Sequence, residues 1–458
     1  MKSELVSSGA PVASYSRRNL PPDCIGNPFL EALDLFKQAD EIIETLFSTV
    51  EVSPEIRQLP AETRDNLTRA VDQLFVPLPR DYELWRRLAK AITDSYLART
   101  NNDPRYFSKL LNARTPVYFG ARTFTSSLII LEGSSRAGKT ASLHRFLQAI
   151  PSVIQHVQYK GEPFYTKQIP WIKLEFPESR ADKDIPREIV SQLCTLLSLS
   201  QPSERSLTKG EFINSVARQF AVHGVGLLVL DDCEHLENYS EKERQGTFNF
   251  LFRLCATIGV AVVCVGTELL VDILASSEPL KNRSIRYPLP RWESLSDEDW
   301  SEFVQELWKI QYTSQFTPLT EKLSTRLREI SGGLPGIAAP IFAEAQSIAI
   351  IRDGFDTGTE VISVEHLDAA LSNVRFLNPS LPRASVESRL DSDDCARRRK
   401  TTNKTDLKVP TTVVKPDLAG RDLLAQLKAE MLAEGACVQS VLESFELQPP
   451  RDLLDYEQ

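Results

Sequence analysis

A short apolar run that breaks into a loop bracketed by glycine limits the fold of this chain more than any other feature. Leu128–Leu131 is apolar, and Gly133 and Gly138 with Lys139 and Thr140 match the pattern G-x-x-x-x-G-K-[ST]. Such a loop lets backbone N–H groups curl around phosphates, and apolar residues at helical spacing follow it. The order strand, loop and helix therefore predicts a nucleotide triphosphate site in an α/β fold, against the alternative of a chance glycine turn. The expected nucleotide contacts are Gly133, Ser134, Ser135, Arg136, Ala137, Gly138, Lys139, Thr140 and Ala141.

A second apolar strand, Gly226–Leu230, ends in Asp231 and Asp232, as a Walker B strand does. We expect Lys139 to reach the β- and γ-phosphates of ATP, and Thr140 and Asp231 to hold Mg²⁺. Most ATPases of this type place a glutamate at the position of Asp232 to polarise the attacking water. An aspartate is one methylene shorter, which predicts slow hydrolysis or a contribution from Glu234.

Composition excludes several classes of protein. The net charge of −9 gives no overall attraction to nucleic acid, so any such contact must come from local patches. Seven cysteines are scattered without a C-x-x-C pair, which argues for reduced thiols and against a zinc site. The chain starts with polar sequence and has no apolar stretch of membrane-spanning length, so we expect a cytoplasmic protein.

Changes in composition along the 458 residues predict several domains. A flexible arm (1–27) precedes a helical N-terminal region (28–115) and a nucleotide-binding core (116–292). A helical lid (293–378) follows, and then a disordered tail (379–458) with one docking helix.

Strands and helices alternate in the core, with strands expected at Ile169–Phe176 and Val260–Val265 and a helix at Ile185–Leu193. This alternation predicts a parallel, doubly wound sheet. The clearest N-terminal helices, Phe29–Phe36 and Tyr82–Ile92, either dock a partner or cover the sheet.

The lid consists of amphipathic stretches around a glycine-rich turn. Helices are expected at Asp297–Trp308, Leu319–Ile330 and Val364–Leu371, the last capped by Ser363. A small helical lid behind a P-loop sheet resembles the AAA+ arrangement. Many AAA+ lids carry an arginine near the turn that corresponds to Ser331–Ile337, and this chain does not, which leaves the coupling of the lid to the γ-phosphate open.

The same resemblance implies two further groups around the nucleotide. Thr267 ends the strand beside Walker B, where AAA+ proteins place the sensor 1 residue; the alternative is a simple helix N-cap. Arg283 and Arg286 precede the end of the core, where an arginine of a neighbouring subunit reaches the γ-phosphate. Arg283 is the better candidate for this finger, and a plain surface arginine remains the alternative for either.

Several stretches together resemble the TnsC/TniB family of transposon-encoded AAA+ regulators. Besides the P-loop, they are Gln168–Pro177, Val265–Glu268 and Arg283–Trp292 with its Pro-Leu-Pro-Arg-Trp ending. The similarity covers roughly Tyr106 to Val374. It implies that ATP-bound protomers assemble head to tail on double-stranded DNA without reading its sequence. They would connect a target-selecting protein to the transposase, and hydrolysis would disassemble the filament.

The tail and Arg136 add expectations about partners. Arg397–Lys400 is basic, and either contacts nucleic acid or is simply solvated. The amphipathic segment Leu423–Glu434 resembles the C-terminal element with which extended family members engage the transposase machinery. We expect Arg136 at a subunit interface rather than on DNA. Two rival classes remain: an Orc/Cdc6-like or STAND-like ATPase switch not linked to transposition, and a scaffold that binds ATP without hydrolysing it.

Overall fold

The computed structural model describes residues 10–97, 128–177, 184–199, 216, 218–275, 289–354 and 359–377. At its centre lies a parallel sheet of four strands in the order β1-β6-β5-β4. These strands are β1 (Leu128–Glu132), β4 (Trp171–Glu175), β5 (Leu227–Asp231) and β6 (Ala261–Gly266). All three pairings in it are parallel, so each connection must cross over the sheet. The predicted parallel α/β fold is confirmed.

One bridge extends this sheet beyond β1. Trp292 donates its N–H to the carbonyl of Glu132 (2.9 Å), and its own carbonyl accepts from the N–H of Ser134 (2.7 Å). A Cβ atom on Gly133 would lie 2.2 Å from the Trp292 carbonyl oxygen, so only glycine allows this approach. The indole of Trp292 is fully buried and donates to Ser142 Oγ (3.2 Å). Trp292, the last residue of the Arg283–Trp292 stretch, therefore lies against the P-loop at an edge of the sheet.

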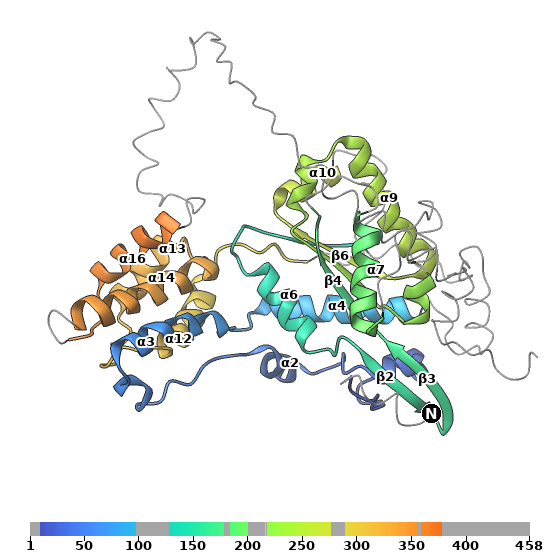
Figure 1. The fold of residues 1–458 in the computed structure, drawn as a ribbon, viewed down its shortest axis with the longest axis horizontal. Helices are drawn as coiled ribbons and strands as arrows, with labels where there is room; N and C mark the ends of the chain where they lie inside the picture. The colour runs from blue at the N-terminus through green and yellow to red at the C-terminus, as the bar shows by residue number, and fades with distance from the viewer. Residues whose placement is uncertain are drawn as a thin grey trace, which may run out of the picture. The chain divides into compact units, whose positions relative to one another are not determined.

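Helices cover both faces of the sheet (Figure 1). One face packs on α7 (Asp184–Leu197), α9 (Glu241–Ile258) and α10 (Glu268–Ala275), and the other on α4 (Pro79–Leu97) and α6 (Lys139–Gln148). Successive strand residues alternate between the faces: Ile130 and Leu228 belong to the first apolar core, and Ile129 and Val229 to the second. The sheet is doubly wound, as predicted.

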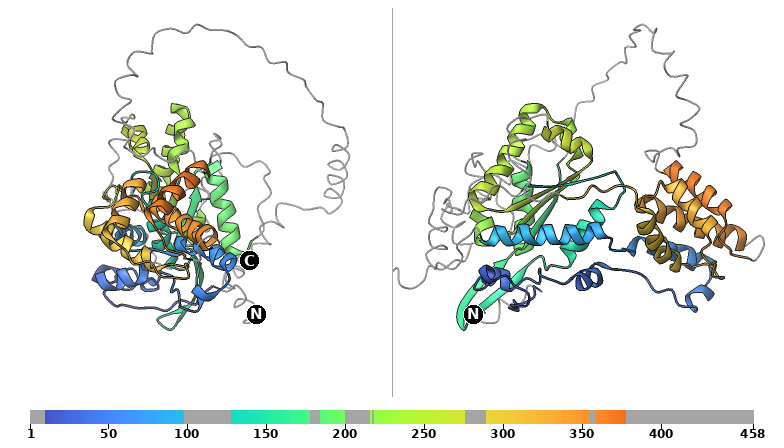
Figure 2. Two further views of the ribbon diagram at one scale, coloured as in Figure 1. Left: turned by 90° about the vertical axis from the view of Figure 1, so that its left-hand side faces the viewer. Right: turned by 180° about the vertical axis from the view of Figure 1, so that it is seen from behind.

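The N-terminal region is divided between the sheet and the lid. Trp85, Leu88 and Ile92 of α4 are buried against the sheet. The view from behind in Figure 2 shows α4 running along the sheet. The segment before it holds α2 (Ala39–Leu46), α3 (Ala61–Leu67) and the 3-10 turns η2 (Ile56–Gln58) and η3 (Thr68–Gln73). Val71 and Leu78 of this segment enter the apolar core of the lid. Of the two expectations for the N-terminal helices, α4 fulfils the one that they cover the sheet.

The helix expected over Phe29–Phe36 is wrong beyond its first turn. The short η1 (Pro22–Cys24) leads into α1 (Pro28–Glu31), which Asn27 caps through its side chain. After Glu31 burial alternates: Leu33 and Leu35 are buried, whereas Asp34 between them is exposed. An extended chain places successive side chains on opposite sides, and this alternation serves the apolar core better than a helix does.

A hairpin between α6 and β4 was not anticipated. It comprises β2 (Ile154–Tyr159) and β3 (Glu162–Gln168), which pair antiparallel. Lys160 and Gly161 at its turn both have positive φ, of 52° and 85°. Two such residues form the turn whose twist matches that of a hairpin, and a glycine at the second position favours it. The Lys-Gly pair between two polar strands is thus a weak sequence signal for a hairpin.

The lid is helical, as predicted. It contains α12 (Asp297–Lys309), α13 (Glu321–Ser331), α14 (Pro335–Ile348), the π-helical η5 (Ala349–Asp353) and α16 (Val364–Leu377). Ser363 Oγ accepts from the N–H of His366 (3.4 Å), which confirms the expected cap. No helix in the described part of the chain is long and apolar enough to cross a membrane.

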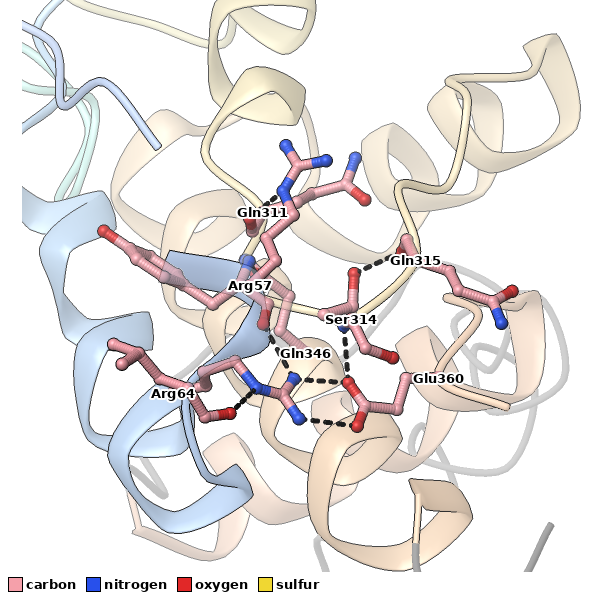
Figure 3. A network of polar contacts seen from close by, with 10 residues as sticks. Arg57, Arg64, Gln311, Ser314, Gln315, Gln346 and Glu360 are labelled. Carbon is pink, nitrogen blue, oxygen red and sulfur yellow. Dashed lines mark hydrogen bonds and ion pairs between the residues drawn. The ribbon is translucent and has the colours of Figure 1, made fainter. Parts of the chain in front are cut away.

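A buried polar network ties α3 to the lid (Figure 3). Arg64 forms an ion pair with Glu360, in which its Nη2 donates to Oε1 at 2.7 Å, and its Nη1 donates to the carbonyl of Tyr312 (2.9 Å). Glu360 also accepts from the N–H of Ser314 (2.6 Å). Because both charged groups are paired and hydrogen-bonded, they remain buried at a modest cost.

The predicted domain limits stay predictions, and Arg397–Lys400 and the docking helix lie outside the described residues.

Candidate nucleotide-binding site

The P-loop joins β1 to α6, and two of its residues have a left-handed backbone. Gly138, directly before α6, has φ = +98°, and Arg136 has φ = +62°. Lys139 is only 8% exposed, and its ammonium donates to the carbonyls of Gly133 (2.8 Å) and Ser134 (2.9 Å). Burial lowers the pKa of Lys139, while the charges of Glu234 and Asp231 act in the opposite direction. The ammonium is therefore held at the loop, and its present partners are weak enough for phosphate oxygens to replace.

The Walker B carboxylate lies against the P-loop hydroxyl. Thr140 Oγ1 donates to Asp231 Oδ1 at 3.3 Å, and the N–H of Asp232 donates to the same oxygen at 3.1 Å. The other oxygen, Oδ2, pairs with Lys173 Nζ at 2.9 Å. Asp231 is 6% exposed, so its carboxylate is shielded from bulk water. No sequence pattern indicates Lys173, because that residue belongs to β4 and lies far from either motif in the chain.

Asp232 has an unusual backbone. It is exposed and adopts the left-handed conformation (φ = 59°, ψ = 41°) directly before the turn η4 (Cys233–Asn238). Aspartate tolerates this region better than glutamate does, because its short side chain finds local hydrogen-bond partners. The backbone thus supplies a physical reason for aspartate at this position. Glu234, which is half-buried, lies on the same turn.

A cavity of about 360 Å³ joins these groups. Its polar wall runs from Ser135 to Ser142 and includes Asp231, Asp232 and Glu234. Its apolar wall comes from the N-terminal segment and the lid, with Val71, Leu74, Phe75, Val76, Leu78, Phe303, Ala339 and Pro340. A polar end with backbone donors and an apolar end suit a phosphate chain attached to a flat base. A larger hollow of about 500 Å³ lies on α4 and contains no P-loop residue.

Arg80 is a second site residue that sequence reasoning missed. Its Nη2 donates to the carbonyl of Ala137 in the P-loop (2.8 Å) and its Nη1 to the carbonyl of Glu293 (3.1 Å). The guanidinium stands 5.6 Å from the ring centroid of Trp292, and burial lowers the pKa of Arg80. This one side chain therefore links α4, the P-loop and the start of the lid. No local pattern marks it, because all three partners are distant in sequence.

The lid touches the P-loop directly. The N–H of Gly336 donates to the carbonyl of Arg136 (3.1 Å), and a Cβ at Gly336 would lie 2.7 Å from that oxygen. The carbonyl of Gly333 accepts from the N–H of Leu295 (3.0 Å). The glycine-rich turn thus lets the lid backbone approach the loop even without the arginine that many AAA+ lids carry there.

The predicted site residues fall into three groups. The predicted residues from Ser135 to Ala141 line the cavity together with Asp231 and Asp232, whereas Gly133 and Ser134 do not line it. Thr267 is half-exposed between β6 and α10, and its carbonyl accepts from the N–H of Leu270 (3.0 Å); its predecessor Gly266 lines the cavity. Arg283 and Arg286 lie outside the described residues. The individual catalytic roles, including that of sensor 1, stay predictions.

A parallel sheet, a P-loop facing a Walker B aspartate and a helical lid define this chain as a P-loop ATPase of the AAA+ class. Over residues 121–294 it matches the TniB family, described as bacterial TniB protein, which confirms the family recognised in the sequence. No curated protein matches the chain.

Three solved structures are similar to this chain at low sequence identity. The Walker-type ATPase PABY2304 of Pyrococcus abyssi is 15% identical, with 60% of this chain and 73% of that chain covered, at a TM-score of 0.34. Cdc6p of Pyrobaculum aerophilum is 15% identical, with 73% and 76% covered, at a TM-score of 0.40. The Drosophila origin recognition complex bound to DNA is 14% identical, with 68% and 70% covered, at a TM-score of 0.36.

Proposed function

We propose that this protein is an ATP-dependent regulator of DNA transposition. It assembles on double-stranded DNA, connects a target-selecting protein to the transposase, and disassembles when ATP is hydrolysed. One observation carries this proposal: the segment that matches the TniB family, 121–294, is the segment whose P-loop and Walker B aspartate meet at the cavity. A cytoplasmic location accords with action on DNA.

The residues at the cavity suit ATP with Mg²⁺. Thr140 offers a hydroxyl and Asp231 a carboxylate within 3.3 Å of each other, and hard cations prefer such oxygen ligands. When bound, Mg²⁺ would neutralise charge on the β- and γ-phosphates. The P-loop N–H groups and the dipole of α6 hold the phosphates, and Lys139 exchanges its two carbonyl partners for phosphate oxygens.

Hydrolysis requires a base for the attacking water. Asp232 is exposed at the edge of the cavity, and Glu234 on the next turn also lines it. We assign the role of this base to Asp232, with Glu234 as the second candidate. Thr267 would contact the γ-phosphate or this water, and Arg283, or else Arg286, would enter from the next protomer. A site completed by its neighbour makes turnover depend on assembly.

Contacts to DNA are proposed to go to phosphates, because a protein that reads no sequence needs only the backbone. With a net charge of −9 the attraction must be local. The tail segment Leu423–Glu434 would engage the transposase, and Arg136 would lie at the contact between protomers.

The experiment measures phosphate release by the full-length protein with and without duplex DNA, together with negative-stain imaging of ATP-dependent filaments. We expect DNA to stimulate release and filaments to require ATP. Lys139→Ala removes a charged hydrogen-bond donor to the phosphates and should weaken ATP binding about tenfold or more. Lys322→Ala, on the exposed side of α13, is the matched control.

The outcomes separate the alternatives. Nucleotide binding without any phosphate release would indicate a scaffold. Release that is indifferent to DNA, with no filaments, would overturn the transposition role and favour an ATPase switch of the Orc/Cdc6-like or STAND-like kind.

A further inference from the structure

Lys173, on the neighbouring strand β4, forms an ion pair with the Walker B aspartate, Asp231. In the ladder between β4 and β5 it lies opposite Val229, whose side chain faces α6 and the P-loop. Directly opposite residues of a ladder point to the same face, so Lys173 lies on the P-loop side of the sheet. Its Nζ is 2.9 Å from Asp231 Oδ2, and its side chain is 24% exposed. This lysine is therefore part of the site, although neither nucleotide motif contains it.

Both oxygens of Asp231 already have donors. Oδ1 accepts from Thr140 Oγ1 and from the N–H of Asp232, and Oδ2 is paired with Lys173. Since Asp231 is nearly buried, water cannot easily replace a lost partner, and a bare carboxylate here would be costly. The ammonium of Lys173 thus satisfies this carboxylate in the structure.

A divalent cation at the same carboxylate would meet the ammonium. Mg²⁺ needs oxygen lone pairs and keeps its ligands at short distances, so it would compete with Lys173 for Asp231 and be repelled by its charge. The phosphates of ATP change the balance, because their negative charge attracts both cations. Metal entry without nucleotide is disfavoured, and joint entry of metal and nucleotide is favoured.

We propose that Lys173 is a positioning residue that acts through Asp231: it holds the Walker B carboxylate until Mg²⁺ arrives with a nucleotide, and so sets the concentration of Mg²⁺ that nucleotide binding requires. The inference rests on the proposed ATP site. It is independent of the role in transposition.

The test titrates Mg²⁺ at a fixed concentration of a fluorescent N-methylanthraniloyl ATP and records binding by the full-length protein. Lys173→Met should lower the Mg²⁺ concentration for half-maximal binding about three- to tenfold, since one competing charge is removed. Lys173→Arg keeps the charge and should stay near wild type. Lys322→Met, exposed on α13, should leave the value unchanged.

A purely structural role would give a different pattern. It would lower the melting temperature of Lys173→Met without shifting the Mg²⁺ concentration for half-maximal binding. If that Mg²⁺ concentration is unchanged or raised in Lys173→Met, the proposal is overturned. Lys173→Gln serves if the methionine variant does not fold. Its melting temperature without nucleotide should rise with added Mg²⁺, whereas that of the wild type should not.

Failure of this inference is distinguishable from failure of the proposed function. If the wild type does not bind the fluorescent nucleotide at any Mg²⁺ concentration, the ATP site itself is wrong. If it binds and the variants show no shift, only the role of Lys173 is wrong.

Discussion

Gly336 donates its backbone N–H to the carbonyl of Arg136 at 3.1 Å, so the first turn of lid helix α14 is hydrogen-bonded to the P-loop. The contact joins two glycine-rich turns that lie about 200 residues apart in the sequence. Arg136 itself has a positive φ, which the surrounding contacts must maintain. The lid and the loop therefore restrain each other before any nucleotide binds.

Gly336→Ala should separate the lid from the loop. The added Cβ would lie 2.7 Å from the Arg136 carbonyl oxygen, a backbone atom that cannot turn away. We expect a loss of about 1–3 kcal/mol in the free energy of unfolding and weaker nucleotide binding. Gly332→Ala is the control, because its Cβ meets nothing within 4 Å and the residue carries only the cost of its positive φ. Denaturant unfolding and nucleotide titration are measured for both variants, and an equal loss of nucleotide affinity in the two would contradict the contact.

Asp232 should control the rate of hydrolysis. Asp232→Asn keeps the left-handed backbone accessible and should reduce phosphate release while leaving nucleotide affinity near wild type. Asp232→Glu should raise the rate and lower stability by about 1 kcal/mol, because glutamate tolerates this backbone less well. Steady-state phosphate release and thermal unfolding measure the two effects. If Glu234→Gln abolishes release and Asp232→Asn does not, the base is Glu234.

Stability should fall in mild acid because of His156. Its ring accepts from Tyr15 Oη at Nδ1 (2.8 Å) and donates from Nε2 to Gln168 Oε1 (2.9 Å), as the neutral tautomer does. Burial lowers the pKa of His156 to about 4 from 6.5. This contribution is complete above pH 6.5 and is lost as the pH falls toward 4, by up to about 3 kcal/mol. Urea unfolding between pH 4 and pH 7 should show that the free energy of unfolding declines less in His156→Gln than in the wild type. The control His144→Gln, at an exposed position, should decline as the wild type does.

Breaking the ion pair in Figure 3 should destabilise the lid strongly. Arg64→Met leaves the buried carboxylate of Glu360 without its main partner and should cost about 3–5 kcal/mol in the free energy of unfolding. The double variant with Glu360→Gln should recover part of this loss. Arg326→Met breaks the more exposed pair with Asp368 and should cost less than about 1 kcal/mol. Similar losses in both single variants would contradict the importance of burial.

Local patterns predicted the parts of this fold that depend on local chemistry. The strands β1, β4, β5 and β6 are apolar runs between turns, and the P-loop has a fixed spacing, so both could be located in the sequence. Phe29–Phe36 misled because its apolar residues fit a helix as well as an extended chain, and the core decided between them.

The missed site residues share a different cause. Arg80 and Lys173 act through partners that only folding brings near, namely the carbonyl of Ala137 and the carboxylate of Asp231. An arginine or a lysine carries no sequence mark of such a partner. Sequence patterns therefore do not predict the tertiary contacts of single polar side chains, even where these side chains contact a recognisable motif.

The division of the N-terminal region has a practical consequence for shortened forms of the protein. Val71 fills the lid core, Trp85 fills the core beneath the sheet, and the stretch between them forms a wall of the cavity. A fragment that begins at residue 116 would keep both nucleotide motifs and expose two apolar surfaces. The smallest autonomous ATP-binding unit of this chain must therefore include residues long before its P-loop.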